Sequence, residues 1–137
     1  MKIKQPQATT KAPQETFTGD AWYDVIAEHE ESPHMRVSIV RFAPGARNAW
    51  HSHVLGQTLY VTEGIGLVQS RGGDVTEIRP GDVVHTPPGE WHWHGATPDQ
   101  FMTHIAMWEV DDQGGAATWG SLVTDEEYRA QPTRNRR

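Results

Sequence analysis

Short apolar runs of strand length, separated by glycine and proline, recur along most of this sequence. They are rich in valine, isoleucine, threonine and aromatic residues, which favour the half-buried surface of a β-sheet. The segments between them carry turn residues, and Gly72-Gly73 is typical of a hairpin. Many short strands at regular spacing predict an all-β sandwich or barrel. The predicted strands are Trp22–Ala27, Met35–Phe42, Thr58–Thr62, Ile65–Ser70, Val75–Ile78, Val83–Thr86, Trp91–His94 and Phe101–Val110.

One helix is predicted near the end of the chain. Glu127 follows Thr124 at the spacing of a capping box, in which each side chain bonds the backbone N–H of the other residue. The pattern predicts a short C-terminal helix over Asp125–Ala130 that packs on the outside of the barrel.

The length and composition predict a single domain with loose ends. We expect a flexible N-terminal lead-in over residues 1–15, the barrel with its helix over residues 16–130, and a solvated basic tail over residues 131–137. A chain of 137 residues buries enough surface to form a core without disulfides, and this one contains no cysteine. The absence of cysteine fits a reducing compartment and removes thiolates as metal ligands or nucleophiles.

Charge and hydropathy argue against two classes of partner. The chain has 12 basic and 18 acidic residues, a net charge of −6, which disfavours nucleic-acid binding. No stretch approaches the ~18 apolar residues that a membrane span requires, and the N-terminal residues lack the apolar run of a secretory signal. We therefore expect a cytoplasmic protein that acts on a small molecule, with no nucleic-acid or membrane partner.

Four side chains form a candidate metal site. His51 and His53 are two positions apart, so on a strand both imidazoles point to the same side. Gln57 opens the next predicted strand, and His92 follows a Pro-Pro-Gly turn. Imidazole is a common ligand of first-row metals, and glutamine supplies a carbonyl oxygen. Meeting inside a barrel, these groups would bind one divalent cation per chain and leave coordination positions open.

The four residues lie in two motifs that resemble those of the cupin superfamily in order and spacing. The first motif runs from Gly45 through His51, His53 and Gln57 to Gly64, and the second from Gly81 through Pro87, Gly89 and His92 to Ala96. The resemblance implies a single-domain cupin, a jelly-roll β-barrel, with His51, His53, Gln57 and His92 as the metal ligands. Gln57 departs from the usual glutamate, which removes one negative charge and makes a bound metal a stronger Lewis acid. Ala96 departs from the asparagine that often closes the second motif.

Longer segments are similar to a bacterial subgroup of small cupins that includes manganese-dependent hydroxynitrile lyases. They include Ala49-Trp50-His51, Leu55-Gly56-Gln57-Thr58-Leu59 and His92-Trp93-His94-Gly95-Ala96. In that subgroup glutamine is usual at the position of Gln57. The resemblance implies a metal-dependent lyase that cleaves or forms small cyanohydrins, with Mn(II) favoured and Fe(II), Ni(II) or Zn(II) as alternatives. It also implies a homodimer or homotetramer.

Two further histidines, His94 and His104, are candidates for acid–base catalysis. The subgroup resemblance implies that both face the pocket, where an imidazole can carry a proton or contact cyanide. Both residues also have a purely structural interpretation. His94 would then be a hydrogen-bonding partner of the metal ligands, and His104 would be a buried core residue.

The candidate substrate pocket contains Ser38, Val40, Asn48 and Trp108. Ser38 and Val40 lie on a strand predicted to line the cavity, and Asn48 precedes the histidine pair. Trp108 departs from the related lyases, which carry a glutamine near the metal at this position. Tryptophan is larger and accepts no hydrogen bond, so we expect it to shrink the pocket, screen the metal or change the substrate.

Two other functions fit the same residues. Three histidines suit Fe(II), and open coordination positions admit O₂, as in cupin dioxygenases that act on small organic substrates. A site filled entirely by protein groups would instead indicate a non-catalytic binding module with a structural metal.

Overall fold

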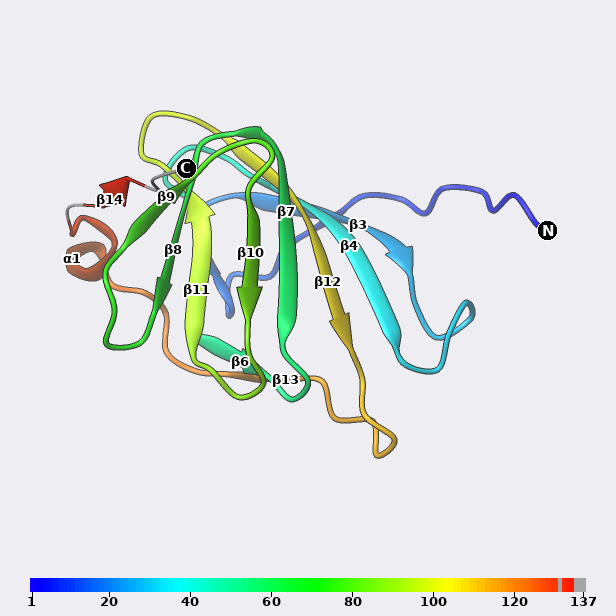
Figure 1. Ribbon diagram of the computed structural model, residues 1–137. Helices are drawn as coiled ribbons and strands as arrows, with labels where there is room; N and C mark the ends of the chain where they lie inside the picture. Colours follow the sequence, from blue (N-terminus) through cyan, green and yellow to red (C-terminus); the bar gives the residue numbers. More distant parts are fainter. Residues whose placement is uncertain (131, 135–137) are drawn as a thin grey trace.

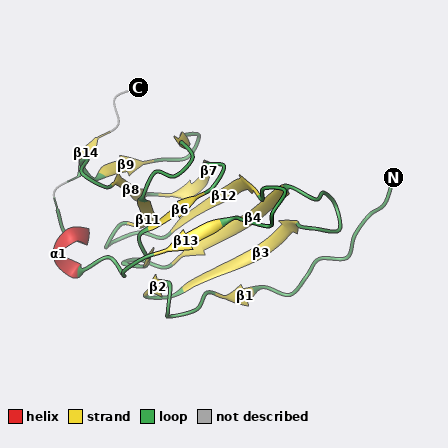
Figure 2. Cartoon of the chain, turned by 90° about the horizontal axis from the view of Figure 1, so that it is seen from below, coloured by secondary structure: helices red, strands yellow, loops and turns green. Residues whose placement is uncertain are grey.

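Two sheets face each other in the computed structural model, which describes residues 1–130 and 132–134 (Figures 1 and 2). The curled sheets enclose a shared interior, which confirms the all-β barrel predicted from the sequence. The elements are β1 (Thr10–Lys11), β2 (Phe17–Thr18), β3 (Ala21–Ala27), β4 (Met35–Phe42), β5 (Arg47–Asn48), β6 (His51–His53), β7 (Gln57–Gly64), β8 (Gly66–Ser70), β9 (Thr76–Ile78), β10 (Val83–Thr86), β11 (His92–Ala96), β12 (Met102–Glu109), β13 (Ala117–Trp119), α1 (Asp125–Tyr128) and β14 (Thr133–Arg134).

The strands pair almost entirely antiparallel. The six-stranded sheet has the order β1-β3-β4-β12-β7-β10, and the main path of the eight-stranded sheet is β13-β6-β11-β8-β9-β14, with β5 pairing β2 and β11. Every strand predicted from an apolar run is present, with its ends shifted by a few residues. The short strands β1, β2, β5, β13 and β14 were not predicted, because two or three residues carry no readable alternation.

The local turn and cap signals are confirmed. Gly72, with a φ of 84°, lies in the turn that joins β8 to its antiparallel partner β9. At the start of α1, the side chain of Thr124 accepts from the backbone N–H of Glu127, and the Glu127 side chain accepts from that of Thr124. The helix ends at Tyr128, two residues before the predicted end. Among the described residues, no helix is long and apolar enough to cross a membrane.

Both ends of the chain contribute a short strand. In the expected lead-in, Thr10–Lys11 pairs with β3, and the residues before it extend away from the barrel (Figure 1). In the expected basic tail, Thr133–Arg134 pairs in parallel with β9, while residues 131 and 135–137 lie outside the described residues.

Two apolar clusters lie on opposite sides of the eight-stranded sheet. The larger fills the space between the sheets and includes Phe42, Leu59 and Met102. The smaller lies under the C-terminal segment, where Trp93 and Tyr128 pack together. The predicted helix position is thus confirmed, since α1 covers the outer face of this sheet.

Gly64 illustrates how tightly two strands approach, and it provides a stability test. It has a φ of 76°, and a Cβ there would lie 1.8 Å from the carbonyl oxygen of Phe101. Gly72 has a similar φ, but a Cβ added to Gly72 would have no other atom within 4 Å. We expect Gly64→Ala to lower the free energy of unfolding by more than ~3 kcal/mol and Gly72→Ala by only ~1 kcal/mol. Urea denaturation measures both; equal losses would contradict the clash.

Candidate metal centre

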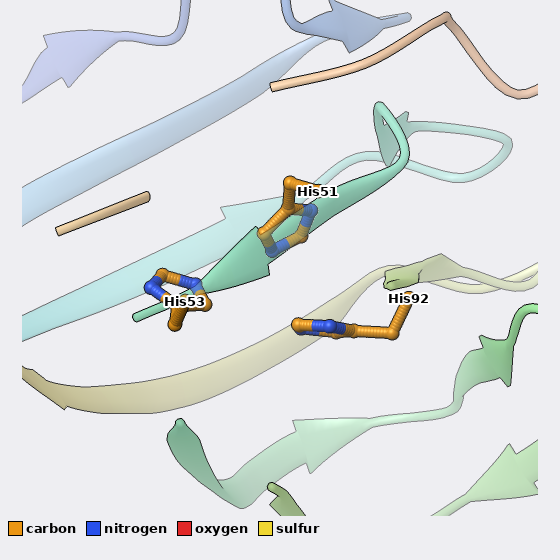
Figure 3. A group of neighbouring side chains, drawn as sticks. All are labelled: His51, His53 and His92. Carbon is orange, nitrogen blue, oxygen red and sulfur yellow. The ribbon is translucent and has the colours of Figure 1, made fainter. Parts of the chain in front are cut away.

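Strand pairing brings three of the four predicted ligands together. His51 on β6 is the cross-strand partner of His92 on β11, and His53 projects from the same strand as His51. The side chains lie around a common space, and one nitrogen from each ring lies within 4.8 Å of the others (Figure 3). All three residues are buried. The alternation predicted for His51 and His53 therefore places both on the barrel interior.

Gln57 completes the group from the start of β7. Its side-chain Oε1 lies 3.0 Å from Nε2 of His92, and the residue is buried. Its strand neighbours are Thr86 on β10 and Trp108 on β12. The four predicted ligands thus come from three strands of both sheets and meet at one point.

Backbone carbonyls orient two of the imidazoles. Nδ1 of His51 lies 2.8 Å from the carbonyl oxygen of Ala49, and Nδ1 of His92 lies 3.0 Å from that of Glu90. A carbonyl oxygen only accepts, so Nδ1 carries the proton in each ring and Nε2 keeps its lone pair. The Nε2 lone pair of His92 then faces the Gln57 oxygen, another acceptor. A cation between the two groups would remove this mismatch.

The surroundings of the His53 ring are a second, independent indication of a metal site. Both ring nitrogens are buried, and neither has a hydrogen-bond partner among the described residues. A buried polar group without a partner costs about 1–3 kcal/mol. A metal ion bound to one nitrogen would offset this cost, so the donor set fits a first-row divalent cation.

Burial keeps these histidines neutral. It lowers the pKa of His53 to about 4 and that of His51 well below the ordinary value, and the neighbouring His92 lowers both further. The pKa of His92 is also lowered by burial. Within the described part of the chain, no carboxylate joins the group. At neutral pH the ligands would therefore leave the charge of a bound cation uncompensated.

A second polar group lies beside the ligands. The backbone N–H of His94 donates to Oδ1 of Asn48 at 2.9 Å, which turns the Asn48 NH₂ toward the His94 ring, 3.1 Å from Nδ1. Nδ1 of His94 also lies 2.9 Å from Nε2 of His104. The Asn48 NH₂ group also lies 3.2 Å from Nε2 of His94. An NH₂ group only donates, so a neutral ring whose Nδ1–H donates to His104 keeps its lone pair on Nε2. Burial lowers the pKa of His94 well below its ordinary value and that of His104 to about 4.

A cavity of about 580 Å³ opens onto the candidate ligands. Its polar floor contains His51, His53, Gln57 and His94, and its walls are mostly apolar. The four predicted pocket residues are all among its lining residues: Ser38, Val40, Asn48 and Trp108. His104 is absent from the described lining and lies behind His94, so only His94 of the two candidate acid–base groups reaches the cavity directly.

The sequence interpretation missed an aromatic wall of this cavity. Trp119 stacks on His51 with ring centroids 4.6 Å apart, and Phe17 lies against Trp119. Trp108 lies on the other side, 5.9 Å from the His53 ring. Tyr23 also lines the cavity. Alternation along Trp22–Ala27 could have indicated Tyr23, whereas Trp119 depends on the register of β13 against β6.

Comparison with known proteins identifies both the family and a close relative. Residues 38–108 match the cupin domain family. The chain is 50% identical over 131 residues to an (R)-mandelonitrile lyase from Granulicella tundricola, covering 94% of this chain and 99% of the relative.

Solved structures agree with the fold. A cupin-like protein from Thermotoga maritima has a TM-score of 0.83 at 40% identity, covering 94% of this chain and 96% of the other. A polyketide cyclase from Streptomyces resistomycificus has a TM-score of 0.72 at 16% identity, covering 93% and 90%. The second likeness concerns the fold alone.

His53 allows a test that separates metal binding from folding. In metal-free protein, His53→Leu removes two unsatisfied nitrogens, so we expect the free energy of unfolding to stay unchanged or rise by about 1 kcal/mol. In the wild type, Mn(II) should raise the melting temperature, and in His53→Leu this increase should be lost. Calorimetry with and without metal measures both. An equal rise in the variant would show that the cation binds elsewhere.

The buried histidines also predict a pH dependence for the metal-free protein. His104 has a pKa of about 4 in the fold and ~6.5 when unfolded, so below pH ~6.5 the unfolded chain binds more protons. Stability is therefore complete above pH ~6.5 and lost progressively toward pH ~4. Denaturant titrations across this range should show that the free energy of unfolding depends less steeply on pH in His104→Gln than in the wild type. A pH-independent midpoint in the wild type would contradict the prediction.

Proposed function

The chain belongs to the cupin family, and on that premise we propose that it is a metal-dependent hydroxynitrile lyase. The reaction would cleave an aromatic cyanohydrin into an aldehyde and hydrogen cyanide, or form it in reverse. The observation that carries the proposal is the 50% identity with an (R)-mandelonitrile lyase along almost the whole chain. The neutral histidine beside the candidate ligands supplies the acid–base group that this chemistry needs.

The residues that would hold the metal are His51, His53, Gln57 and His92. When bound, a divalent cation supplies Lewis acidity that makes the substrate hydroxyl easier to deprotonate. Mn(II) is the proposed ion, with Fe(II), Ni(II) and Zn(II) as alternatives, because neutral nitrogen and amide ligands bias this choice only weakly.

His94 is proposed as the group that moves the proton. Nε2 of its neutral ring takes the proton of the cyanohydrin hydroxyl, the bond between the carbinol carbon and the nitrile carbon breaks, and the electron pair leaves on cyanide. The proton then passes from His94 to cyanide, so that the products are an aldehyde and HCN. Since the proton that leaves the oxygen ends on the leaving group, no external acid is consumed.

His104 and Asn48 would act through His94. His104 contacts Nδ1 of His94 and can share its added proton, while Asn48 holds the backbone and the ring of His94 in one orientation. Both are buried, so neither exchanges protons freely with bulk water. Their proposed role is to keep His94 neutral and correctly oriented before each turnover.

The cavity suits a substrate with an aromatic ring. Trp119, Phe17 and Trp108 supply flat apolar surface next to the candidate ligands, and Val40 and Ala106 line the side toward the six-stranded sheet. Aromatic pairs of this kind contribute about 0.5–1.5 kcal/mol beyond the area that they bury. Because Trp108 borders His53, we expect it to restrict the substrate on that side.

Mandelonitrile cleavage tests the proposal. Purified protein loaded with Mn(II) should release benzaldehyde from racemic mandelonitrile at mildly acidic pH, where the uncatalysed reaction is slow. His53→Ala should lose metal and activity together. His94→Ala should keep its metal while the rate falls by ~10²–10⁴, the usual contribution of an acid–base group. Absorbance measures benzaldehyde, and elemental analysis measures the metal.

The exposed-residue variant His29→Ala is the matched control and should retain the wild-type rate. Benzaldehyde release no faster than in His53→Ala would refute the lyase proposal. Oxygen uptake by the Fe(II)-loaded protein with small phenols or diketones, in the same series, would instead favour the dioxygenase.

A further inference from the structure

An arginine lies on the interior face of β4, next to the candidate substrate pocket. Alternate side chains of a strand point to the same side, so Arg36 shares the face of Ser38 and Val40, and all three line the cavity. Arg36 is half-buried. Among the described lining residues, the other charged side chain is that of Glu28. Neither the candidate metal site nor the proposed proton transfer uses this cation, so its presence on a mostly apolar wall calls for another explanation.

Strand register sets the distance between Arg36 and the candidate metal centre. Arg36 on β4 is the cross-strand partner of Trp108 on β12, and Trp108 is also the partner of Gln57 on β7. The three strands lie side by side in the order β4, β12, β7 (Figure 1). Adjacent strands are about 4.8 Å apart, so the backbones of Arg36 and Gln57 are separated by roughly 10 Å. One row across the sheet thus presents a cation, an apolar ring and a candidate ligand.

Backbone carbonyls hold one end of the Arg36 guanidinium. Its Nη1 donates to the carbonyl oxygen of Ser32 at 3.1 Å and to that of Met35 at 2.9 Å. Within residues 1–130 and 132–134, Nε and Nη2 have no hydrogen-bond partner, and no carboxylate forms an ion pair with this side chain. By contrast, three other arginines form ion pairs within the chain: Arg41, Arg47 and Arg79. The guanidinium is therefore oriented by the protein, while its charge has no direct counter-ion in this part of the chain.

The other charges of the cavity favour an anionic occupant. Oε1 of Glu28 accepts from Nε2 of Gln7 at 3.0 Å, so this carboxylate is engaged by the N-terminal segment. Burial keeps the candidate ligands neutral, and a divalent cation on them would add positive charge at the far end of the row. A partly enclosed pocket with positive charge at both ends attracts a negatively charged small molecule.

We propose that Arg36 binds a carboxylate of the substrate, and that the cavity selects aromatic cyanohydrins that carry this group on the ring. The proposal rests on the lyase function, which places the carbinol end of the substrate at the candidate ligands. The free N–H groups of Nε and Nη2 match the two oxygens of a carboxylate, a pairing that guanidinium groups favour. Trp108 supplies apolar surface for the ring between the two ends. A carboxylate para to the carbinol carbon lies farthest from the ligands and is therefore the expected isomer.

Binding of two matched aldehydes to the Mn(II)-loaded, full-length protein tests this inference. The ligands para-formylbenzoate and its methyl ester share the ring and the aldehyde but differ in charge. By isothermal titration calorimetry, the wild type should bind the carboxylate ~10-fold more tightly than the ester, and Arg36→Gln should remove this preference. Arg36→Lys keeps the charge without the planar fork and should retain part of the preference. Arg41→Gln, on the outer face of the same strand, is the control and should leave the preference unchanged.

A second measurement, on the wild type alone, covers the case in which Arg36→Gln fails to fold. Because Arg36 belongs to the chain, the preference for the carboxylate should persist in metal-free protein. A preference that disappears with the metal, or that survives in folded Arg36→Gln, would place the carboxylate elsewhere and overturn the inference, as would equal affinities of the wild type for the two ligands.

The binding measurements and the cleavage assay can fail separately. If mandelonitrile is not cleaved but the wild type prefers the carboxylate through Arg36, the lyase proposal fails and the carboxylate site stands. If mandelonitrile is cleaved and Arg36→Gln does not alter the preference, the lyase proposal stands and the carboxylate site is refuted.

Discussion

The antiparallel pairing of β6 with β11 is the constraint on which the candidate site depends. It places His51 opposite His92, adds His53 from the same strand face, and buries all three rings in a space with no neighbouring carboxylate among the described residues. Burial lowers the pKa values and leaves both nitrogens of His53 without partners. Such an arrangement is costly for an empty pocket and suited to a cation, because the metal supplies the interaction that the protein groups lack.

The C-terminal segment, which packs outside the barrel, helps to hold residues of this site in place. The buried Arg47 on β5 donates to the carbonyl oxygen of Val123 and to Asp125, and its guanidinium lies over the Tyr128 ring. The next residue is Asn48, which orients His94. The C-terminal segment therefore reaches the site through two adjacent residues of one short strand. A loss of this outer layer would loosen β5 and, with it, the hydrogen bonds that hold His94.

The two sheets differ in their outer surfaces and in what they contribute to the candidate site. The eight-stranded sheet carries three of the candidate ligands, and the C-terminal segment of the same chain covers its outer face. The six-stranded sheet contributes Gln57 and one cavity wall from its inner face, while its outer face stays apolar and exposed. The same strands thus line the proposed active site on one side and carry exposed apolar side chains such as Tyr60 and Val83 on the other.

The sequence by itself determined the longer strands, the C-terminal cap and the shared face of His51 and His53. Alternation has a period of two, so His51 and His53 had to share a face, and Thr124 with Glu127 had to cap a helix. Only the tertiary structure decided which residues lie next to these groups. Register between distant strands places Trp119 on His51 and His104 against His94. Local periodicity does not encode these contacts, because cross-strand neighbours depend on pairing between segments far apart in the chain.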